Sequence, residues 1–181
     1  MFTLKVANTQ LEIRVGDITA QDTEAVVNAA NSRLAPGGGV AGAIHRAAGP
    51  GLWEECARLG GCATGQAVLT AGHQLPNAYV IHTVGPVYSG NPQDAELLES
   101  CYENSLRLAD AHAIATIAFP ALSTGIFGYP LEAAARVALE AIVNYLNGPT
   151  GLELVRLVLY DENAYAAHEK VIKEIKCKYS L

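Results

Sequence analysis

The residues best suited to chemistry lie in one stretch, Asn28 to Arg46, where two asparagines and a proline precede three consecutive glycines. The stretch starts at the end of an apolar run, Ala25–Val27, and passes into a helical pattern. Ordering Gly37–Gly39 costs more backbone entropy than ordering almost any other tripeptide, so such a run is kept where side chains must be absent. A strand, a glycine loop and a helix N-terminus together form a cradle whose N–H groups and dipole favour an anion.

A second glycine-bearing loop, Ser123–Gly128, also joins an expected strand to an expected helix. Two such loops at neighbouring strand ends can hold a diphosphate from both sides; the alternative is that the Gly37–Gly39 run is a plain flexible connection. The sequence lacks the lysine-containing P-loop pattern, which leaves nucleoside triphosphate hydrolysis unsupported, and it lacks G-x-G-x-x-G at its first helix, which disfavours a Rossmann dinucleotide site.

Single polar side chains near these loops each have a structural and a functional interpretation. Asp17 either caps the next helical turn or accepts a hydrogen bond from an exocyclic amine such as that of adenine. Asn31 either ends a strand or binds a sugar hydroxyl, and Tyr160 either packs in the core or stacks on a purine. His82 lies within a strand pattern and is expected to be a core histidine, whereas the role of His45 stays open.

The periodicity predicts alternating strands and helices along the whole chain. Strands are expected at 2–6, 11–15, 25–30, 67–70, 78–84, 114–119 and 152–160, and helices at 40–48, 52–59, 94–111, 131–146 and 164–175. Apolar residues in the 131–146 segment recur at helical spacing, and the 152–160 strand is almost continuously apolar, as in a sheet covered on both faces. The fold class is therefore α/β, a sandwich around a mixed, mostly parallel sheet.

In such sheets the ligand crevice lies beyond the carboxyl ends of the strands. The informative stretches all follow strands: Asp17-Ile18, Asn31 to Gly42, Ser123 to Gly128, and Tyr160 to Asn163. This coincidence carries more weight than any single motif.

Composition limits the classes of function. The chain has 181 residues, 50% of them hydrophobic and 17% charged, which indicates one folded domain over 1–181. Its net charge of −6 argues against a nonspecific nucleic-acid duplex binder, and the basic 170–178 segment reads as the solvated face of a last helix.

The four cysteines form no C-x-x-C pair and have no histidine at zinc spacing, so free thiols and no metal are expected. The start lacks the apolar core of a signal peptide and no run is long enough to span a bilayer, so we expect no membrane association and a cytoplasmic, monomeric protein.

Six motifs, in order, resemble the macro domain family of the MacroD type over nearly the whole chain, from Leu11 to about Ile175. They are Gly16-Asp17-Ile18-Thr19, Val27-Asn28-Ala29-Ala30-Asn31, Gly37-Gly38-Gly39-Val40, Ala43 to Pro50, His82-Thr83-Val84-Gly85-Pro86 and Phe119 to Gly125. The resemblance implies a three-layer α/β/α sandwich that binds ADP-ribose and ADP-ribosylated proteins, with no cofactor and no metal.

The same resemblance assigns roles along the ligand. Asp17 and the Ile18 backbone read adenine with Tyr160 beside it, the glycine loops hold the diphosphate, and the distal ribose faces Asn31 under Phe127. The ligand-binding residues it implies are Asp17, Ile18, Asn31, Gly38, Gly39, Val40, Gly42, Ser123, Thr124, Gly125, Ile126, Phe127, Tyr160 and Asn163, and the catalytic ones are Asn31, Gly39, Ala41 and Phe127.

MacroD-type members hydrolyse the bond between ADP-ribose and protein acidic side chains and deacetylate O-acetyl-ADP-ribose. Their glycine motif carries an aspartate where this chain has Ala41, and that aspartate has been assigned to the attacking water. Some macro domains that also carry Val-Ala-Gly are still regarded as hydrolases, with the water held between the distal ribose and a diphosphate oxygen. Two interpretations follow: an ADP-ribosyl hydrolase, which we favour, and a non-catalytic ADP-ribose reader.

Overall fold

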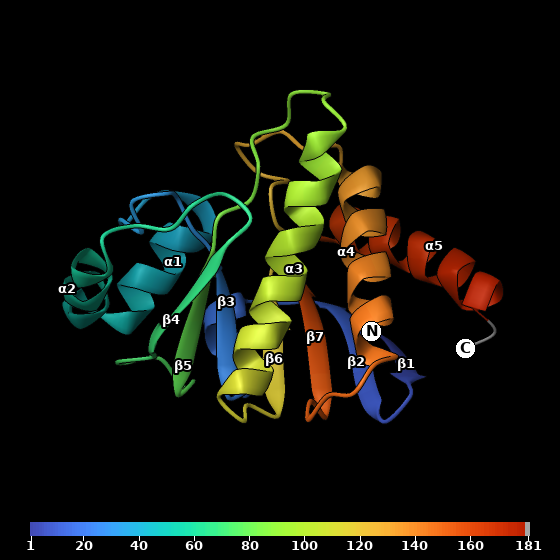
Figure 1. Ribbon diagram of the computed structural model, residues 1–181, viewed down its shortest axis with the longest axis horizontal. Coiled ribbons are helices and arrows are strands. Elements are labelled where there is room, and N and C mark those ends of the chain that lie inside the picture. Colours follow the sequence, from blue (N-terminus) through green and yellow to red (C-terminus); the bar gives the residue numbers. More distant parts are fainter. Residues whose placement is uncertain (180–181) are drawn as a thin grey trace.

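The computed structural model describes residues 1–179, which form a seven-stranded mixed sheet between two groups of helices (Figure 1). The strand order across the sheet is β1-β2-β7-β6-β3-β5-β4. The strands are β1 (Phe2–Val6), β2 (Thr9–Val15), β3 (Ala25–Ala29), β4 (Ala67–Ala71), β5 (Tyr79–Thr83), β6 (Thr116–Phe119) and β7 (Leu154–Leu159).

The five central strands, β2, β7, β6, β3 and β5, run parallel, and β1 and β4 pair antiparallel to their neighbours at the two edges. The mixed, mostly parallel sheet expected from the sequence is therefore confirmed. Each parallel strand ends at the same edge of the sheet, so the loops that follow them are neighbours in space although they are far apart in the chain.

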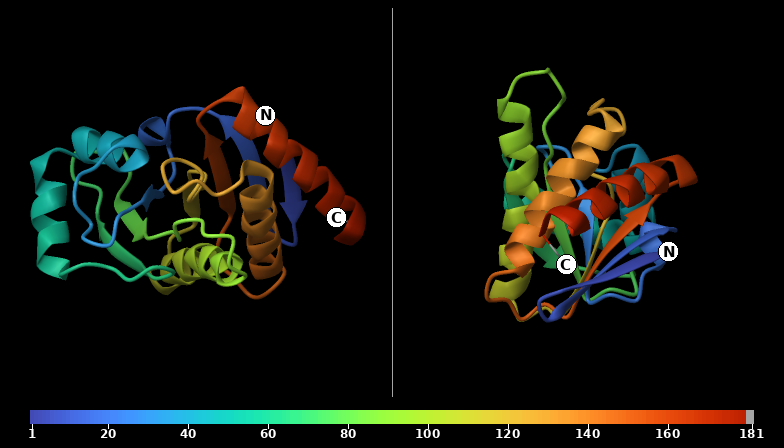
Figure 2. Two further views of the ribbon diagram at one scale, coloured as in Figure 1. Left: turned by 90° about the horizontal axis from the view of Figure 1, so that it is seen from above. Right: turned by 90° about the vertical axis from the view of Figure 1, so that its right-hand side faces the viewer.

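Helices cover both faces. They are α1 (Gly39–Ala48), α2 (Pro50–Leu59), α3 (Gln93–Ala111), α4 (Leu131–Leu146) and α5 (Glu162–Tyr179), together with a short 3₁₀ turn, η1 (Ile18–Ala20). The larger hydrophobic cluster joins α3, α4 and α5 to one face, and the smaller joins α1, α2 and η1 to the other. Figures 1 and 2 show α3 and α4 running side by side along the sheet.

The expected elements match the observed ones with one shift of physical interest. The strand expected from Ile114 begins only at Thr116, because the chain is still completing the C-terminal turn of α3. Ala113 adopts a positive φ of 54°, and the Ile114 N–H donates to the Ala109 carbonyl at 2.9 Å. Ile114 is therefore buried as part of a helix cap rather than as a strand residue.

His82, in the middle of β5, is a core histidine as the sequence indicates. Its Nδ1 accepts from the Asn28 amide at 3.1 Å, and its Nε2 lies 2.9 Å from the Thr70 hydroxyl. Burial, with a smaller contribution from nearby His45, lowers the pKa of His82 to about 3. The ring is therefore neutral in the folded protein at physiological pH.

We predict that this histidine makes folding sensitive to mild acid. An unfolded His82 takes up a proton near pH 6.5, whereas the folded one does so only near pH 3. Between these values the unfolded state binds the extra proton, so the free energy of unfolding falls as pH falls, by about 1.4 kcal/mol per pH unit for this group. Urea unfolding between pH 7 and 4 measures the slope, and an NMR titration of the folded ring that shows protonation near pH 6.5 would contradict the assignment.

Candidate functional site

The stretches singled out from the sequence meet at one edge of the sheet, along the upper side in Figure 1 and facing the viewer in the left view of Figure 2. Four adjacent parallel strands, in the order β2, β7, β6 and β3, end there. Asp17 and Ile18 follow β2, Tyr160 follows β7, Ser123–Gly128 follow β6 and Asn31 follows β3. With strands about 4.8 Å apart, the row extends over about 14 Å.

The side chain of Asn31 holds the shape of the first loop, which joins β3 to α1. Its Oδ1 accepts from the N–H groups of Arg33 at 3.2 Å and Ala35 at 3.0 Å, and its Nδ2 donates to the Ala35 carbonyl at 2.8 Å. These three bonds occupy one of the two amide protons, which leaves the other for a ligand. The amide thus both shapes the loop and keeps a donor at its surface.

The glycines that follow differ in what they require. Gly39 has a positive φ of 55°, which favours glycine, and a Cβ added at Gly38 or Gly39 would meet no other atom within 4 Å. Gly42 is the crowded position, because an added Cβ would lie 2.3 Å from the Gly37 carbonyl oxygen. Ala41, between them on α1, is buried with 6% of its surface exposed.

The second loop is held in an unusual backbone conformation. Ser123 has a φ of +64°, which is uncommon for a residue with a side chain, and its carbonyl accepts from the Tyr129 N–H at 2.9 Å. Gly128 N–H closes a turn onto the Gly125 carbonyl at 3.0 Å. Among the described residues, the N–H groups of 124–127 donate to no other protein group, so they are available to an anion.

Gly85, two residues after β5, is what allows this loop to approach the segment that follows β5, a strand separated from β6 by β3. A Cβ on Gly85 would lie 2.1 Å from the Ser123 hydroxyl oxygen. That hydroxyl is buried and has no hydrogen-bond partner in the described structure. The close approach therefore fixes the loop at the cost of one unsatisfied polar group.

Two large apolar side chains of the site extend into solvent. Ile126 is 99% exposed and Tyr160 is 94% exposed, so the interpretation of Tyr160 as a core residue is wrong. Phe127, next to Ile126, is half-buried, and Asn163 is exposed in the first turn of α5. Large apolar groups exposed beside polar groups that have no protein partner are typical of a surface that a ligand or partner covers.

Asp17 caps η1, the structural role considered from the sequence. Its Oδ1 accepts from the Thr19 hydroxyl at 2.7 Å and the Thr19 N–H at 2.8 Å, which lower the pKa of this exposed carboxyl. Oδ2 and the Ile18 N–H make no hydrogen bond to the described residues. Capping uses only one carboxylate oxygen and therefore does not exclude a ligand on the other.

Sequence reasoning missed the polar network behind Asp17. Arg156 interrupts the apolar pattern of β7 and binds Glu12 at 2.6 Å and Asp22 at 2.6 Å. Gln21, 3% exposed, connects this pair to the Asp17 carbonyl. The only sequence signal was the placement of a single arginine within an otherwise apolar strand.

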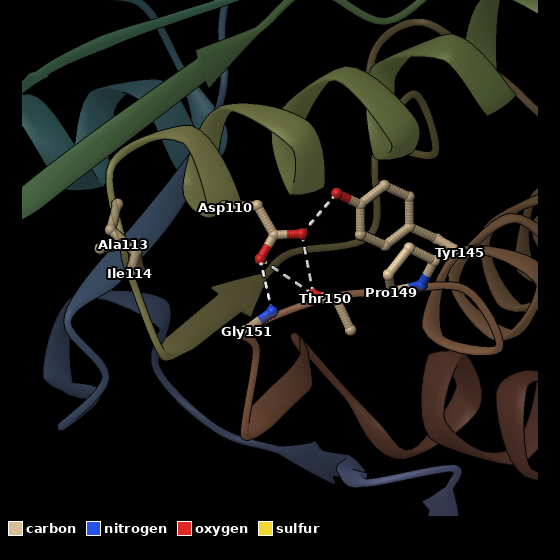
Figure 3. A pocket seen from close by; sticks show the side chains of 7 residues that line it. All are labelled: Asp110, Ala113, Ile114, Tyr145, Pro149, Thr150 and Gly151. Carbon is tan, nitrogen blue, oxygen red and sulfur yellow. Dashed lines mark hydrogen bonds between the residues drawn. The ribbon is translucent and has the colours of Figure 1, made fainter.

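Two cavities lie outside the row of strand ends. One of about 360 Å³ lies between the first loop, α1 and α2, and its lining includes Gly37, Gly42 and Trp53. A larger one, about 620 Å³, lies at the opposite edge of the sheet, where Figure 3 shows the Asp110 carboxylate bound by Tyr145, Thr150 and Gly151. Those donors already engage both oxygens of the Asp110 carboxylate, the one acidic side chain that lines this cavity.

Two further expectations concern metals and membranes. Within residues 1–179, no three histidine, cysteine or acidic side chains gather in a way that could hold a metal ion. In that same part of the chain, no helix combines the length and apolar character needed to cross a membrane. The cysteines Cys56, Cys62, Cys101 and Cys177 are free thiols.

Comparisons with known proteins agree on one family. A model described as Macro domain matches residues 27–138. The chain is 46% identical over 168 residues to an O-acetyl-ADP-ribose deacetylase of Enterobacter sp., covering 90% of this chain and 93% of that protein. It is 56% identical over 133 residues to the ADP-ribose glycohydrolase MACROD2 of Xenopus laevis, covering 72% of this chain and 32% of that protein.

A solved structure gives the same result. The Oceanobacillus iheyensis macrodomain with ADP superimposes with a TM-score of 0.95 at 40% identity, covering 98% of this chain and 97% of that one. A mutant of that macrodomain was solved with ADPR. These matches confirm the family and fold that the six motifs indicate.

We predict that Gly42, in the first turn of α1, is the glycine of this stretch on which folding depends. Gly42→Ala places a Cβ against the Gly37 carbonyl oxygen, and overpacking of this kind costs about 1–3 kcal/mol. Gly38→Ala is the matched control, because its Cβ meets no atom within 4 Å and its φ is negative. Urea unfolding of both variants measures the difference, and equal stability of the two would contradict the expectation.

Proposed function

This chain belongs to the macro domain family, and from that premise we propose that it binds ADP-ribose and hydrolyses mono-ADP-ribosyl esters on acidic side chains of proteins. O-acetyl-ADP-ribose, an ester of the same kind, is a second substrate under this proposal. The observation that carries it is the order of the strand ends: a carboxylate and an exposed tyrosine, then free N–H groups, then an asparagine amide. ADP-ribose presents an adenine, a diphosphate and a distal ribose in that order.

The β2–β7 end suits the adenine. Under this proposal, Asp17 Oδ2 accepts from the exocyclic amine, the Ile18 N–H donates to a ring nitrogen, and Tyr160 stacks on the base; the free Ile18 N–H and the exposure of Tyr160 support it. Asn163 follows Tyr160 by three residues, in the first turn of α5, and completes this end of the proposed site. A purine stacked on Tyr160 would cover this side chain, which accounts for its exposure in the protein alone.

The middle of the row suits the diphosphate. On the β6 side it would meet the free N–H groups of 124–127. On the β3 side it would meet the N–H groups of 39–41, which belong to the first turn of α1. The first N–H groups of a helix have no partner within the helix, and the helix dipole favours negative charge there. No basic side chain is needed for this arrangement.

The β3 end suits the distal ribose, with the remaining Asn31 amide proton as a donor to a hydroxyl and Phe127 covering the sugar. In the hydrolase proposal, a water lies between that ribose and a diphosphate oxygen, near Gly39 and Ala41. Positioning and backbone electrostatics can supply much of the barrier reduction without a titrating side chain. The alternative is a reader that binds the same ligand without hydrolysis, and Ala41 is the feature that favours it.

The binding part of the proposal predicts that ADP-ribose binds at least about tenfold more tightly than AMP, because only ADP-ribose reaches both loops. Gly125→Val tests whether the two loops hold the diphosphate between them. A Cβ at Gly125 meets no protein atom within 4 Å, so we expect the fold to be retained while the added side chain obstructs the approach of the diphosphate to the loop. Calorimetry should show ADP-ribose affinity reduced by about tenfold or more and adenosine affinity unchanged. Equal losses of affinity for ADP-ribose and adenosine would argue against diphosphate binding between the two loops.

The catalytic part predicts that the wild-type protein releases ADP-ribose from a glutamyl-ADP-ribosylated protein in a single turnover, without an aspartate at position 41. Asn31→Ala should slow release by about 100-fold, as loss of precise positioning can. Ser32→Ala, an exposed change on the same loop, is the control. Release is followed by intact mass.

Three outcomes separate the enzyme from the reader. Rapid wild-type release supports the hydrolase. Wild-type release no faster than the protein-free control, with ADP-ribose binding intact, leaves the reader. A gain of activity only in Ala41→Asp would show that water activation at this site needs the carboxylate.

A further inference from the structure

Gln21 occupies an unusual position between the ion pairs on the sheet and the turn at the end of β2. It is 3% exposed and lies directly after η1. Its Oε1 accepts from Arg14 at 2.7 Å and from Arg156 at 3.2 Å, and its Nε2 donates to the Asp17 carbonyl at 2.6 Å. Because guanidinium groups can only donate, they fix which end of the amide is the oxygen and which the donor.

The anchor of this amide is rigid. Arg156 and Glu12 are paired residues of the adjacent parallel strands β7 and β2, and the Arg156 Nε donates to Glu12 at 2.6 Å. The Arg156 side chain is only 8% exposed and also binds Asp22. A buried, strand-anchored guanidinium of this kind has few alternative positions, so Gln21 is held in one orientation.

The clamp on Asp17 has a consequence for the next residue. The Asp17 carbonyl and the Ile18 N–H belong to one planar, trans peptide unit, in which they point in opposite directions. The Asp17 carbonyl also accepts from the Ala20 N–H at 3.2 Å, within the 3₁₀ turn. With Gln21 holding this carbonyl toward the ion pairs at the shorter distance of 2.6 Å, the Ile18 N–H points away from them. Hydrogen bonding to the carbonyl also polarises the peptide and strengthens the N–H as a donor.

We propose that Gln21 is a positioning residue for base selectivity: by clamping the Asp17 carbonyl to Arg14 and Arg156, it orients the Ile18 N–H and the Asp17 carboxylate as the donor–acceptor pair that distinguishes adenine. The inference rests on the proposed function, because it concerns how the same site reads its ligand. It assigns to the network behind the turn a role beyond folding.

Gln21→Glu separates the clamp from the fold. A glutamate still accepts from Arg14 and Arg156, so the network on the sheet is kept, but it has no N–H to donate to the Asp17 carbonyl. Gln21→Met, which keeps the volume and loses both sets of bonds, is the second variant. Gln10→Leu is the matched control, because Gln10 donates to Glu12 in the same network at 2.6 Å without contacting Asp17.

The readout is the ratio of dissociation constants for inosine diphosphate ribose and ADP-ribose, measured by calorimetry. Inosine replaces the exocyclic amine with a carbonyl and the ring acceptor with a donor, so it mismatches both recognition groups. We expect the wild-type preference for ADP-ribose to fall by about tenfold in Gln21→Glu and Gln21→Met, the size of one well-placed hydrogen bond, and to persist in Gln10→Leu.

The outcomes distinguish this inference from the proposed function. If the wild type prefers ADP-ribose and whichever Gln21 variant folds keeps that preference, or loses affinity for both ligands equally, the positioning role is overturned while ADP-ribose binding stands. If the wild type binds neither ligand, the proposed function fails and the inference fails with it. A loss of preference in Gln10→Leu as well would assign the effect to the ion pairs in general rather than to Gln21.

Discussion

The parallel backbone pairing of β2, β7, β6 and β3 is the constraint on which the rest of the structure depends. Val15 pairs with Leu159, Phe119 with Leu157, and Val26 with Ala118, so these strands end at one edge. Hydrogen bonds within the sheet therefore set the spacing of groups that come from widely separated parts of the chain. The helices on both faces bury the sheet and hold that edge fixed, but they do not choose which residues meet there.

Local polar contacts then shape each loop on this frame. Asn31 closes the first loop through its own side chain, and Ser123 holds the second in a left-handed backbone conformation. At Ser123 this conformation costs backbone strain and leaves the hydroxyl without a hydrogen-bond partner. The close packing of Ser123 against Gly85 leaves the loop little space for another conformation. The result is a row of outward N–H groups that is formed before any ligand arrives, which reduces the entropy lost on binding.

Short-range patterns predicted the elements well, and long-range contacts account for what could not be predicted. The helical spacing from Leu131 to Leu146 and the apolar run of β7 each reflect burial that the chain carries in its own periodicity. The Gln21 contact with Arg156, by contrast, joins residues 135 positions apart and depends on the register of two strands. The crowding at Gly42 likewise depends on where the loop folds back, which composition alone does not determine.

The charges of the site also explain how an acidic chain can hold an anionic ligand under the proposed function. The net charge is −6, and Asp17 is an exposed, ionised carboxylate in the same row as the N–H groups proposed for the diphosphate. Those groups follow β6, two strand intervals or about 10 Å from β2, which is beyond the screening length of about 8 Å at physiological salt. Repulsion between the carboxylate and the phosphates is therefore small, while binding in the reverse orientation would leave the N–H groups without their anion. Under the proposed function, the same separation that keeps Asp17 away from the diphosphate thus favours the orientation with the adenine at the β2 end.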